Sequence, residues 1–272
     1  MSRRTVRPLR PVAPYVGGKK GLAKTIIEEI EKTPHDIYAE AFVGMAGVFL
    51  RRTTAAKVEV INDYSRDVAT FFRVLQRHYT AFMEMMRFQL TTRAEFERLA
   101  ATDPTTLTDL ERAARFFYLQ RTCFGGKASG RNFGVSADRP GRFNIVRLGP
   151  LLEDLHERLA GVVIECLDFR EFIPRYDKPA ALFYLDPPYF GSENYYGDGM
   201  FRRADFEALR DVLKGLQGRF IMSINDTPRS AEIFSDFTLK KVETTYTVGG
   251  GRRAKRAGEL IITGPGKRRR ND

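Results

Sequence analysis

Short apolar runs alternate with amphipathic stretches along most of the chain. Several runs are almost continuously apolar, which is typical of strands buried on both faces of a parallel sheet. We predict strands at residues 37–42, 58–62, 161–166, 181–185, 220–224, 239–248 and 259–263. Helical patterns lie between them at residues 20–32, 65–76, 150–159 and 203–216. This alternation predicts an α/β fold with a doubly wound, mostly parallel sheet.

Two regions depart from the alternation. The last two predicted strands face each other across three glycines at 249–251, so we expect an antiparallel C-terminal hairpin at one edge of the sheet. The other region begins at residue 77, reads as helical, and loses its periodicity over residues 121–147. Long irregular segments in compact domains usually carry function. We therefore predict an inserted, mainly helical subdomain at 65–154, within a main domain formed by 1–64 and 155–272.

Composition excludes several classes of protein. The chain has 272 residues and is 43% apolar, which is too apolar for a disordered protein and ample for a large core. Its two cysteines and three histidines lack ligand spacing, so we expect no metal site. We find no apolar run that could span a membrane and no apolar stretch behind the basic N-terminus. These features predict a cytoplasmic protein with no membrane partner.

The positive charge is concentrated in three short segments. The net charge is +11, and residues 1–10, 251–258 and 267–272 contribute +4, +4 and +3, so the remainder of the chain is neutral. Concentrated basic segments favour a polyanionic partner such as nucleic acid. The alternative is that they are solvated tails and a loop that keep the protein soluble.

The clearest chemical motif is Asp186-Pro187-Pro188-Tyr189, directly after the apolar run at 181–185. In doubly wound folds, ligands bind at the carboxyl ends of the strands. A carboxylate and a rigidly held Pro187 carbonyl can each accept one N–H of an exocyclic base amine, which makes that nitrogen more nucleophilic. The prolines fix φ, and the tyrosine ring offers a stacking face for an extruded base. The alternative is a strand followed by a Pro-Pro turn, with the acid as a cap.

Three further segments suit a nucleotide ligand. The glycine-containing turn 42–47 follows the first predicted strand, where glycine allows close approach of the backbone to a ligand. Asp63 ends the next strand, about twenty residues later, where an acid can bind ribose hydroxyls. A tight turn and a helix cap are the respective alternatives. Two glycines also precede Lys19 and Lys20, but the spacing of a P-loop and its Ser/Thr are missing, which argues against an ATPase.

Taken in order, these motifs resemble a known family. The sequence PYVGGKK at 14–20, then FVGMAG at 42–47, INDYS at 61–65, a long insertion and DPPY is similar to that of the Dam-like, D12 class DNA adenine-N6 methyltransferases. Residues 223–227, and residues 246–253 with 259–260, resemble the family's later strand end, basic hairpin loop and final strand. The segment CFGG at 123–126 resembles phage and prophage members most. The chain departs from the family at Met45, where a smaller residue is more common.

The resemblance implies a Rossmann-like methyltransferase sheet that uses S-adenosyl-L-methionine as methyl donor. The catalytic residues would be Asp186, Pro187, Pro188 and Tyr189. The residues implied at the cofactor are Tyr15, Lys19, Phe42, Gly44, Gly47, Asp63, Asp168 and Phe169. Among them Gly44 would approach the methionine part, Asp63 would hold the ribose hydroxyls, and Asp168 would accept from the exocyclic amine of the cofactor adenine. Lys19 would lie near the cofactor or the DNA.

The resemblance also implies a flipped adenine in double-stranded DNA as the acceptor, and makes the insertion the target-recognition part. The residues expected at the DNA are Arg121, Lys127, Arg131, Asn132, Arg142, Arg252, Arg253 and Lys255. Guanidinium and amide groups can read base edges in the major groove, although most such groups contact phosphates. We expect a monomer or weak dimer in a bacterial or phage-infected cell, and a role in restriction-modification, phage protection or host regulation.

Three alternatives stay open at this stage. The first two are transfer to cytosine N4 and methylation of RNA, since the DPPY motif is shared among amino-methyltransferases. The third is a non-catalytic DNA-binding relative. Methylation of a cytosine ring carbon is not expected, because neither cysteine follows a proline.

Overall fold

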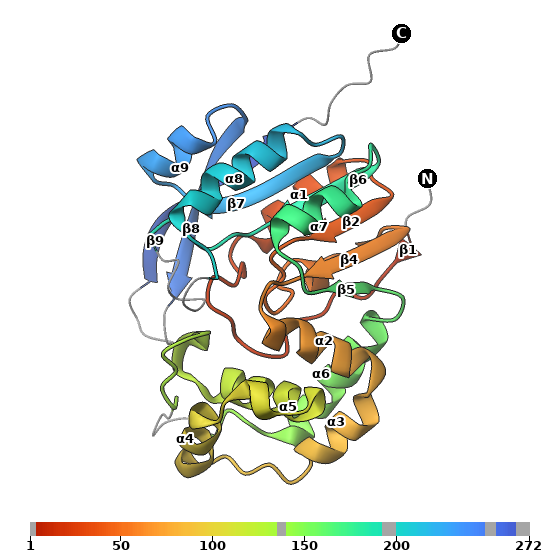
Figure 1. Ribbon diagram of the computed structural model, residues 1–272, viewed down its shortest axis with the longest axis vertical. Helices are drawn as coiled ribbons and strands as arrows, with labels where there is room; N and C mark the ends of the chain where they lie inside the picture. The colour runs from red at the N-terminus through yellow and green to blue at the C-terminus, as the bar shows by residue number, and fades with distance from the viewer. Residues whose placement is uncertain (1–3, 135–139, 192–199, 248–253, 265–272) are drawn as a thin grey trace.

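The computed structural model describes residues 4–134, 140–191, 200–247 and 254–264 (Figure 1). A seven-stranded sheet runs through it in the order β5-β4-β2-β6-β7-β9-β8. The strands in that order are β5 (Val163–Glu165), β4 (Val58–Asn62), β2 (Ile37–Glu40), β6 (Ala181–Leu185), β7 (Arg219–Asn225), β9 (Ala254–Gly264) and β8 (Thr238–Thr247). The first five are parallel, and β9 is antiparallel to both of its neighbours. The predicted doubly wound sheet with an antiparallel C-terminal hairpin is confirmed.

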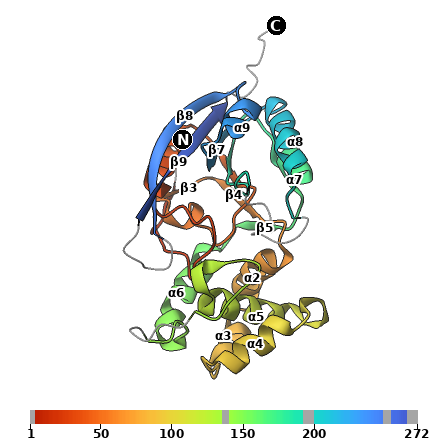
Figure 2. The ribbon, with the colours of Figure 1, turned by 90° about the vertical axis from the view of Figure 1, so that its left-hand side faces the viewer.

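Both faces of the sheet are covered at its centre, which explains why β6 is apolar throughout and β7 is largely buried. Residues 181, 183 and 185 of β6 belong to one hydrophobic cluster. This cluster also includes residues of α7 (Phe169–Tyr176), α8 (Arg203–Lys214) and α9 (Pro228–Ile233). Figure 2 shows α7 and α8 together on that side of the sheet. Residues 182 and 184 instead belong to a cluster with α1 (Ala23–Lys32). Side chains of β6 thus alternate between the two faces. Asp186 is the first residue beyond β6, at the edge between strand and loop.

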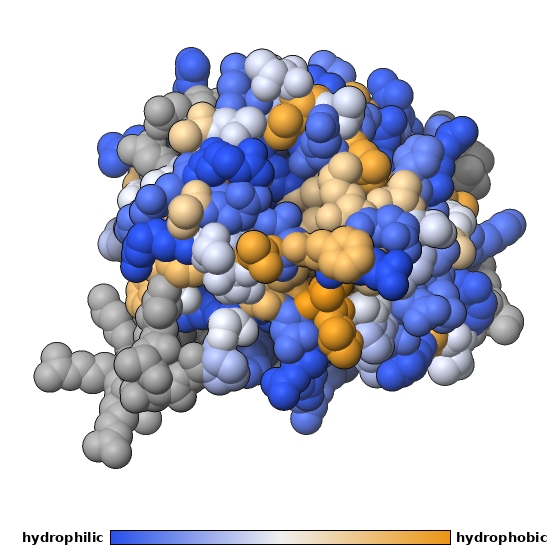
Figure 3. All heavy atoms as spheres, turned by 90° about the horizontal axis from the view of Figure 1, so that it is seen from below, coloured by the Kyte–Doolittle hydropathy of each residue, from blue (hydrophilic) through white to orange (hydrophobic). Residues whose placement is uncertain are grey.

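The segment predicted as an insertion forms a helical layer below the sheet in Figure 1. It comprises α2 (Arg66–Arg77), α3 (Tyr79–Met86), α4 (Arg93–Ala101), α5 (Asp109–Thr122) and α6 (Ile145–Arg158). Helix α5 is central and buries ten of its fourteen residues, including Phe116 and Phe117. Phe71 stacks on Phe117 with ring centroids 5.5 Å apart. Seen from below, apolar side chains gather among polar ones on the surface of this layer (Figure 3).

The helical layer and the sheet share one hydrophobic cluster. Val68 and Leu155 from the helices lie in the same cluster as Ile61 and Tyr184 from the sheet. The boundary predicted at residue 154 falls inside α6. The hydrophobic packing is therefore continuous across this boundary, which divides the sequence but not the core.

Several local expectations differ from the structure. The predicted turn at 42–47 leads into a 3₁₀ turn, η1 (Phe49–Arg51), which was not predicted. Helix α6 begins five residues before the predicted Pro150, because the Asn144 side chain caps it by accepting from the Arg147 N–H at 3.2 Å. Helices α7 and α9 and the short pair β1 (Arg4–Thr5) and β3 (Thr54–Ala55) were not predicted. They are too short to show a period, and α7 also contains a proline.

Candidate active site

The carboxyl ends of the parallel strands open into a large cavity of about 1800 Å³. Residues after β2, β4 and β6 line one side of it, and the turn after α5 together with residues 140–142 lines another. The predicted residues that line it are Tyr15, Lys19, Phe42, Gly44, Gly47, Asp63, Arg121, Lys127, Arg142, Asp186, Pro188 and Tyr189. The fold thus gathers predicted residues from six separate parts of the sequence at one place.

Asp186 lies immediately after β6, with its side chain 19% exposed. Its Oδ1 is 2.8 Å from the Lys19 ammonium and accepts from the Ser223 hydroxyl at 3.2 Å. The Ser223 hydroxyl is itself 2.8 Å from the Tyr184 hydroxyl. Burial raises the pKa of Asp186 to about 6, although Lys19 and Ser223 both act to lower it. The carboxyl is therefore ionised near neutral pH and poised to exchange a proton.

Lys19 is the centre of a buried polar cluster. Its side chain is only 2% exposed, and besides Asp186 it donates to the Tyr189 hydroxyl at 2.6 Å. The Tyr189 hydroxyl donates in turn to Glu259, whose other carboxylate oxygen is 3.6 Å from the Lys19 nitrogen. Glu259 is fully buried on β9. The ammonium thus compensates two carboxylates that would otherwise be costly to bury.

The loop after β6 is held from the neighbouring antiparallel strands. Asn225 on β7 and Glu259 on β9 are register partners. The Asn225 side chain accepts from the Phe190 N–H at 2.9 Å and donates to the Phe190 carbonyl at 3.0 Å. Two adjacent strand residues therefore hold two consecutive loop residues, Tyr189 and Phe190. This arrangement fixes the direction of the DPPY loop.

The turn after β2 is tied to the end of β4. Gly44 has φ of +50°, and its N–H donates to the Asp63 carboxylate at 2.8 Å. A Cβ at Gly44 would lie 3.0 Å from the Tyr15 ring, so glycine is required both for φ and for the close approach. Asp63 also accepts at 2.9 Å from the N–H of Ser65, the N-cap residue of α2. Burial raises the pKa of Asp63 to about 6.

Residues 15–248 of the chain match the D12 class N6 adenine-specific DNA methyltransferases. The chain belongs to this family. It is 26% identical over 279 residues to the type II methyltransferase M1.LlaDCHI of Lactococcus lactis subsp. cremoris, covering 95% of this chain and 96% of that one. It is 21% identical over 240 residues to the type II methyltransferase M.CviBI of Paramecium bursaria Chlorella virus NC1A, covering 88% and 91%.

A phage relative matches part of a longer chain. The DNA N-6-adenine-methyltransferase of Escherichia phage P1 is 28% identical over 210 residues, which cover 73% of this chain and 26% of that one. Membership of the D12 class confirms the predicted activity, DNA adenine methylation, and the resemblance to phage-type enzymes. It also accounts for the order of the motifs along the sheet.

Sequence reasoning overlooked the functional potential of Glu40 and assigned Glu259 only to the final strand. Glu40 is buried at the end of β2, lines the cavity, and accepts from the Tyr38 hydroxyl at 2.6 Å. Burial raises the pKa of Glu40 to about 8. An acid inside an otherwise apolar strand was the available signal at both positions, since burial of an acid needs compensation.

Asp168 and Phe169 lie outside the cavity wall. Asp168 caps α7, accepting from the Arg170 N–H at 2.8 Å and pairing with the Arg170 guanidinium at 3.2 Å. Phe169 is buried and packs against Phe42, with ring centroids 6.0 Å apart. Pro187 is buried, and its neighbours Asp186 and Pro188 line the cavity. The adenine contact of Asp168 therefore stays a prediction.

Three of the arginines predicted at the DNA bond to backbone carbonyls in this structure. Arg121 donates to the carbonyls of Val12 at 3.2 Å and Arg142 at 2.8 Å. Arg142 donates to the Cys123 carbonyl at 2.9 Å, and Arg131 to the Lys127 carbonyl at 3.2 Å. These bonds tie the described residues of this segment to one another and to the N-terminal segment through backbone carbonyls. Contact of any of these groups with DNA stays a prediction.

The remaining DNA candidates lie in different settings. Asn132 is exposed, and its carbonyl accepts from the Phe124 N–H at 2.8 Å. Lys255 pairs with Tyr246 in the β8–β9 ladder. Arg252 and Arg253 lie outside the described residues.

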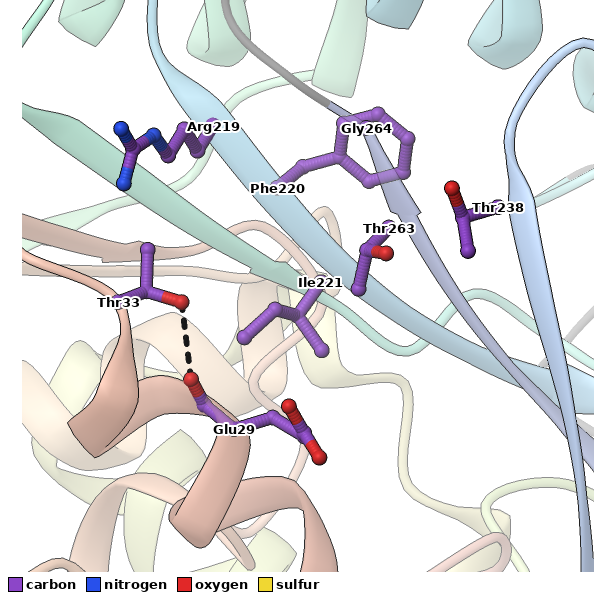
Figure 4. A pocket seen from close by; sticks show the side chains of 8 residues that line it. All are labelled: Glu29, Thr33, Arg219, Phe220, Ile221, Thr238, Thr263 and Gly264. Atoms are coloured by element: carbon purple, nitrogen blue, oxygen red, sulfur yellow. Dashed lines mark hydrogen bonds between the residues drawn. The ribbon is translucent and has the colours of Figure 1, made fainter.

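A second hollow, of about 250 Å³, lies at the opposite end of the sheet. Arg219 at the start of β7 and Gly264 at the end of β9 line it, and Glu29 of α1 closes one side (Figure 4). The Glu29 carboxylate is already paired with Lys240 at 3.2 Å. None of the residues predicted to act in catalysis or binding lies there.

Two searches of the described residues gave no result. Within 4–134, 140–191, 200–247 and 254–264, no group of three or more His, Cys, Asp or Glu side chains could hold a metal ion. In the same part of the chain, no helix is long and apolar enough to cross a membrane.

Proposed function

We propose that the protein transfers the methyl group of S-adenosyl-L-methionine to N6 of an adenine that is flipped out of double-stranded DNA. The observation that carries this proposal is the position of the Asp186 carboxylate, directly after β6 at the wall of the cavity. Lys19 and Ser223 hold this carboxylate in place. A pKa of about 6 keeps this group ionised at neutral pH, so it can accept an N–H of the target amine.

The residues around the glycine turn fit the cofactor. Gly44 and Tyr15 both line the cavity, and the missing Cβ of Gly44 lets the Tyr15 ring pack against its backbone, where a Cβ would be only 3.0 Å from the ring. Asp63 lines the cavity, and each carboxylate oxygen accepts one backbone N–H while keeping a further lone pair for the donor hydroxyls of a ribose. When bound, the cofactor supplies a methyl group on a positively charged sulfur. Phe42 offers an apolar wall packed from behind by Phe169.

The chain's own residues act on the target nitrogen. Asp186 accepts one N–H and the Pro187 carbonyl the other, which localises the nitrogen lone pair. The nitrogen forms the new N–CH₃ bond as the S–CH₃ bond breaks, with that electron pair remaining on sulfur. Asp186 then takes the proton released from the nitrogen. No covalent bond to the protein is needed. The Tyr189 ring, held by Lys19 and Glu259, supports the extruded base.

The decisive experiment compares two aspartate variants with the wild type. Asp186→Ala is expected to lower methyl transfer from labelled S-adenosyl-L-methionine by a factor of about 10³ or more while duplex binding persists. Asp63→Ala is expected to weaken cofactor binding. Asp211→Ala, an exposed acid on α8, is the matched control and should match the wild type.

Analysis of the nucleosides by mass spectrometry identifies the acceptor. We expect N6-methyladenine in DNA. Product found only as N4-methylcytosine, or only in RNA, would overturn the proposed acceptor. Unchanged transfer by Asp186→Ala would overturn the proposed mechanism.

A further inference from the structure

Arg51 is a half-buried cation on the wall of the same cavity. It ends the 3₁₀ turn that follows the glycine turn, and its guanidinium donates to the Gly47 carbonyl at 2.5 Å. A Cβ at Gly47 would be 3.6 Å from this guanidinium and 3.8 Å from the Lys19 backbone nitrogen. Arg51 therefore lies where the 44–47 turn approaches the 15–19 segment.

Arg10 brings a second guanidinium to the same wall. The N-terminal segment runs antiparallel to residues 50–55: the Leu9 N–H donates to the Leu50 carbonyl at 2.6 Å, and the Val6 N–H to the Thr53 carbonyl at 2.9 Å. Continued by one residue, this pairing sets residue 10 opposite residue 49, in the same 3₁₀ turn as Arg51. Burial, and then the charge of Arg10, lowers the pKa of Arg51.

Neither cation is neutralised within the described part of the chain. Among those residues, no acid lies within 4.0 Å of either guanidinium, whereas the buried Arg52 next in sequence pairs with Glu59 at 2.8 Å. Glu40, Asp63 and Asp186 line other parts of the cavity, more than 4.0 Å from both guanidinium groups. Two neighbouring like charges with no acid that close are unfavourable unless an anion joins them. Arginine is also the side chain best suited to carboxylate and phosphate.

We propose that Arg51 and Arg10 form an anion subsite that binds a carboxylate or phosphate group of a ligand in the cavity. The position beside Gly44 and Gly47 favours the α-carboxylate of the cofactor's methionine part, and a DNA phosphate is the other source of the same chemistry. The inference rests on the proposed function, because it assigns a part of the same site. It gives a ligand-binding role to a segment of the N-terminal charge.

The test compares S-adenosyl-L-methionine with its decarboxylated form, which keeps the amine and the sulfonium. Affinities are measured by calorimetry for the wild type, Arg51→Met, Arg51→Lys and Arg10→Met. Arg210→Met is the control, because this arginine of α8 is also half-buried but pairs with Asp211 at 2.7 Å. Binding of a DNA duplex is measured across a salt series in parallel, and thermal melting reports folding.

For a carboxylate ligand, the wild type should prefer the complete cofactor by about tenfold or more, and Arg51→Met should lose this preference. Arg51→Lys should keep part of it, and Arg10→Met should reduce it. For a phosphate ligand, the preference should be unchanged, while duplex affinity falls and the salt slope decreases by about one in Arg51→Met. Either pattern supports the subsite and identifies its ligand.

The subsite is overturned if Arg51→Met and Arg10→Met bind both cofactor forms and the duplex within twofold of the wild type. If Arg51→Met is unfolded at room temperature, the test uses Arg10→Met, whose substituted residue is exposed, and the preference of the wild type for the complete cofactor over the decarboxylated form. Failure of the wild type to bind either cofactor form would count against the proposed function instead. The duplex measurements would then judge the subsite alone.

Discussion

The acids at the strand ends differ from surface acids because burial raises the pKa of each. Asp186 and Asp63 are shifted to about 6, and Glu40 to about 8. Each shift reflects the cost of removing a carboxylate from water, reduced to a different extent by its hydrogen-bond donors. Acids with such values cluster at functional sites, since they can exchange protons near neutral pH.

Methyl transfer is expected to lose activity below about pH 6, where Asp186 becomes protonated. At saturating cofactor, kcat/KM for DNA should fall about tenfold per pH unit in that range. Ser223→Ala removes a hydroxyl that lowers the pKa of Asp186, so the acid limb should move to higher pH. Ser235→Ala, an exposed serine, is the control. An acid limb that does not move in Ser223→Ala would contradict this role.

Glu259→Gln tests the charge of the buried cluster. The Glu259 carboxylate raises the pKa of Asp186, so its removal should move the acid limb to lower pH, opposite to Ser223→Ala. Glutamine still accepts from the Tyr189 hydroxyl, so the loop should remain in place. Glu243→Gln on β8 is an exposed control. If the acid limb of kcat/KM lies at the same pH in the wild type and in Glu259→Gln, Glu259 does not act on Asp186.

Glu40 should make stability depend on pH. Its pKa is higher in the folded chain, about 8 against an ordinary 4.5, so the folded state favours the protonated form. The free energy of unfolding therefore falls as the pH rises from about 4.5 to 8 and then levels off. Glu40→Gln should raise the denaturation midpoint at pH 9 and change it little at pH 4. An equal effect at both values would refute this account.

At the scale of elements, the cavity wall depends on loops fixed by side chains of a buried helix. Gln120 of α5 donates to the carbonyls of Pro14 and Gly126, each at 2.7 Å. The Val16 N–H also donates to the Gly126 carbonyl at 2.9 Å. These bonds hold the segment that carries Tyr15 and Lys19 against the turn after α5. The helical layer thereby helps to shape the site.

Gly126→Ala should disrupt this contact. The glycine has φ of +70°, and a Cβ there would lie 2.9 Å from the backbone of Pro14 and Tyr15. We expect a loss of about 1–3 kcal/mol in stability and weaker cofactor binding. Gly125→Ala is a matched control, because Gly125 has the same φ but nothing within 4 Å of the added Cβ. If the two variants behave alike, backbone strain alone explains the effect, and the close approach is irrelevant.

At the scale of the whole molecule, the net charge of +11 is distributed in segments around a neutral body. Duplex affinity is expected to fall steeply with salt, because each phosphate contact releases counterions. The Arg252→Ala, Arg253→Ala double variant should lower the log–log salt slope by about two. Arg87→Ala, at the end of α3, is an exposed control. A flat salt profile for the wild type would contradict the DNA partner.

The sequence by itself determined the sheet, its antiparallel edge and the order of the motifs, because buried parallel strands leave continuous apolar runs and DPPY follows one of them. Only the tertiary structure decided which polar groups meet. Lys19, Tyr189 and Glu259 are separated by 170 and 70 residues, and no local pattern connects them. The same holds for Arg10 beside Arg51, which a backbone pairing brings together. Hydrophobic periodicity reports burial along one element, whereas electrostatic pairing depends on the distance between elements, which the packed fold alone sets.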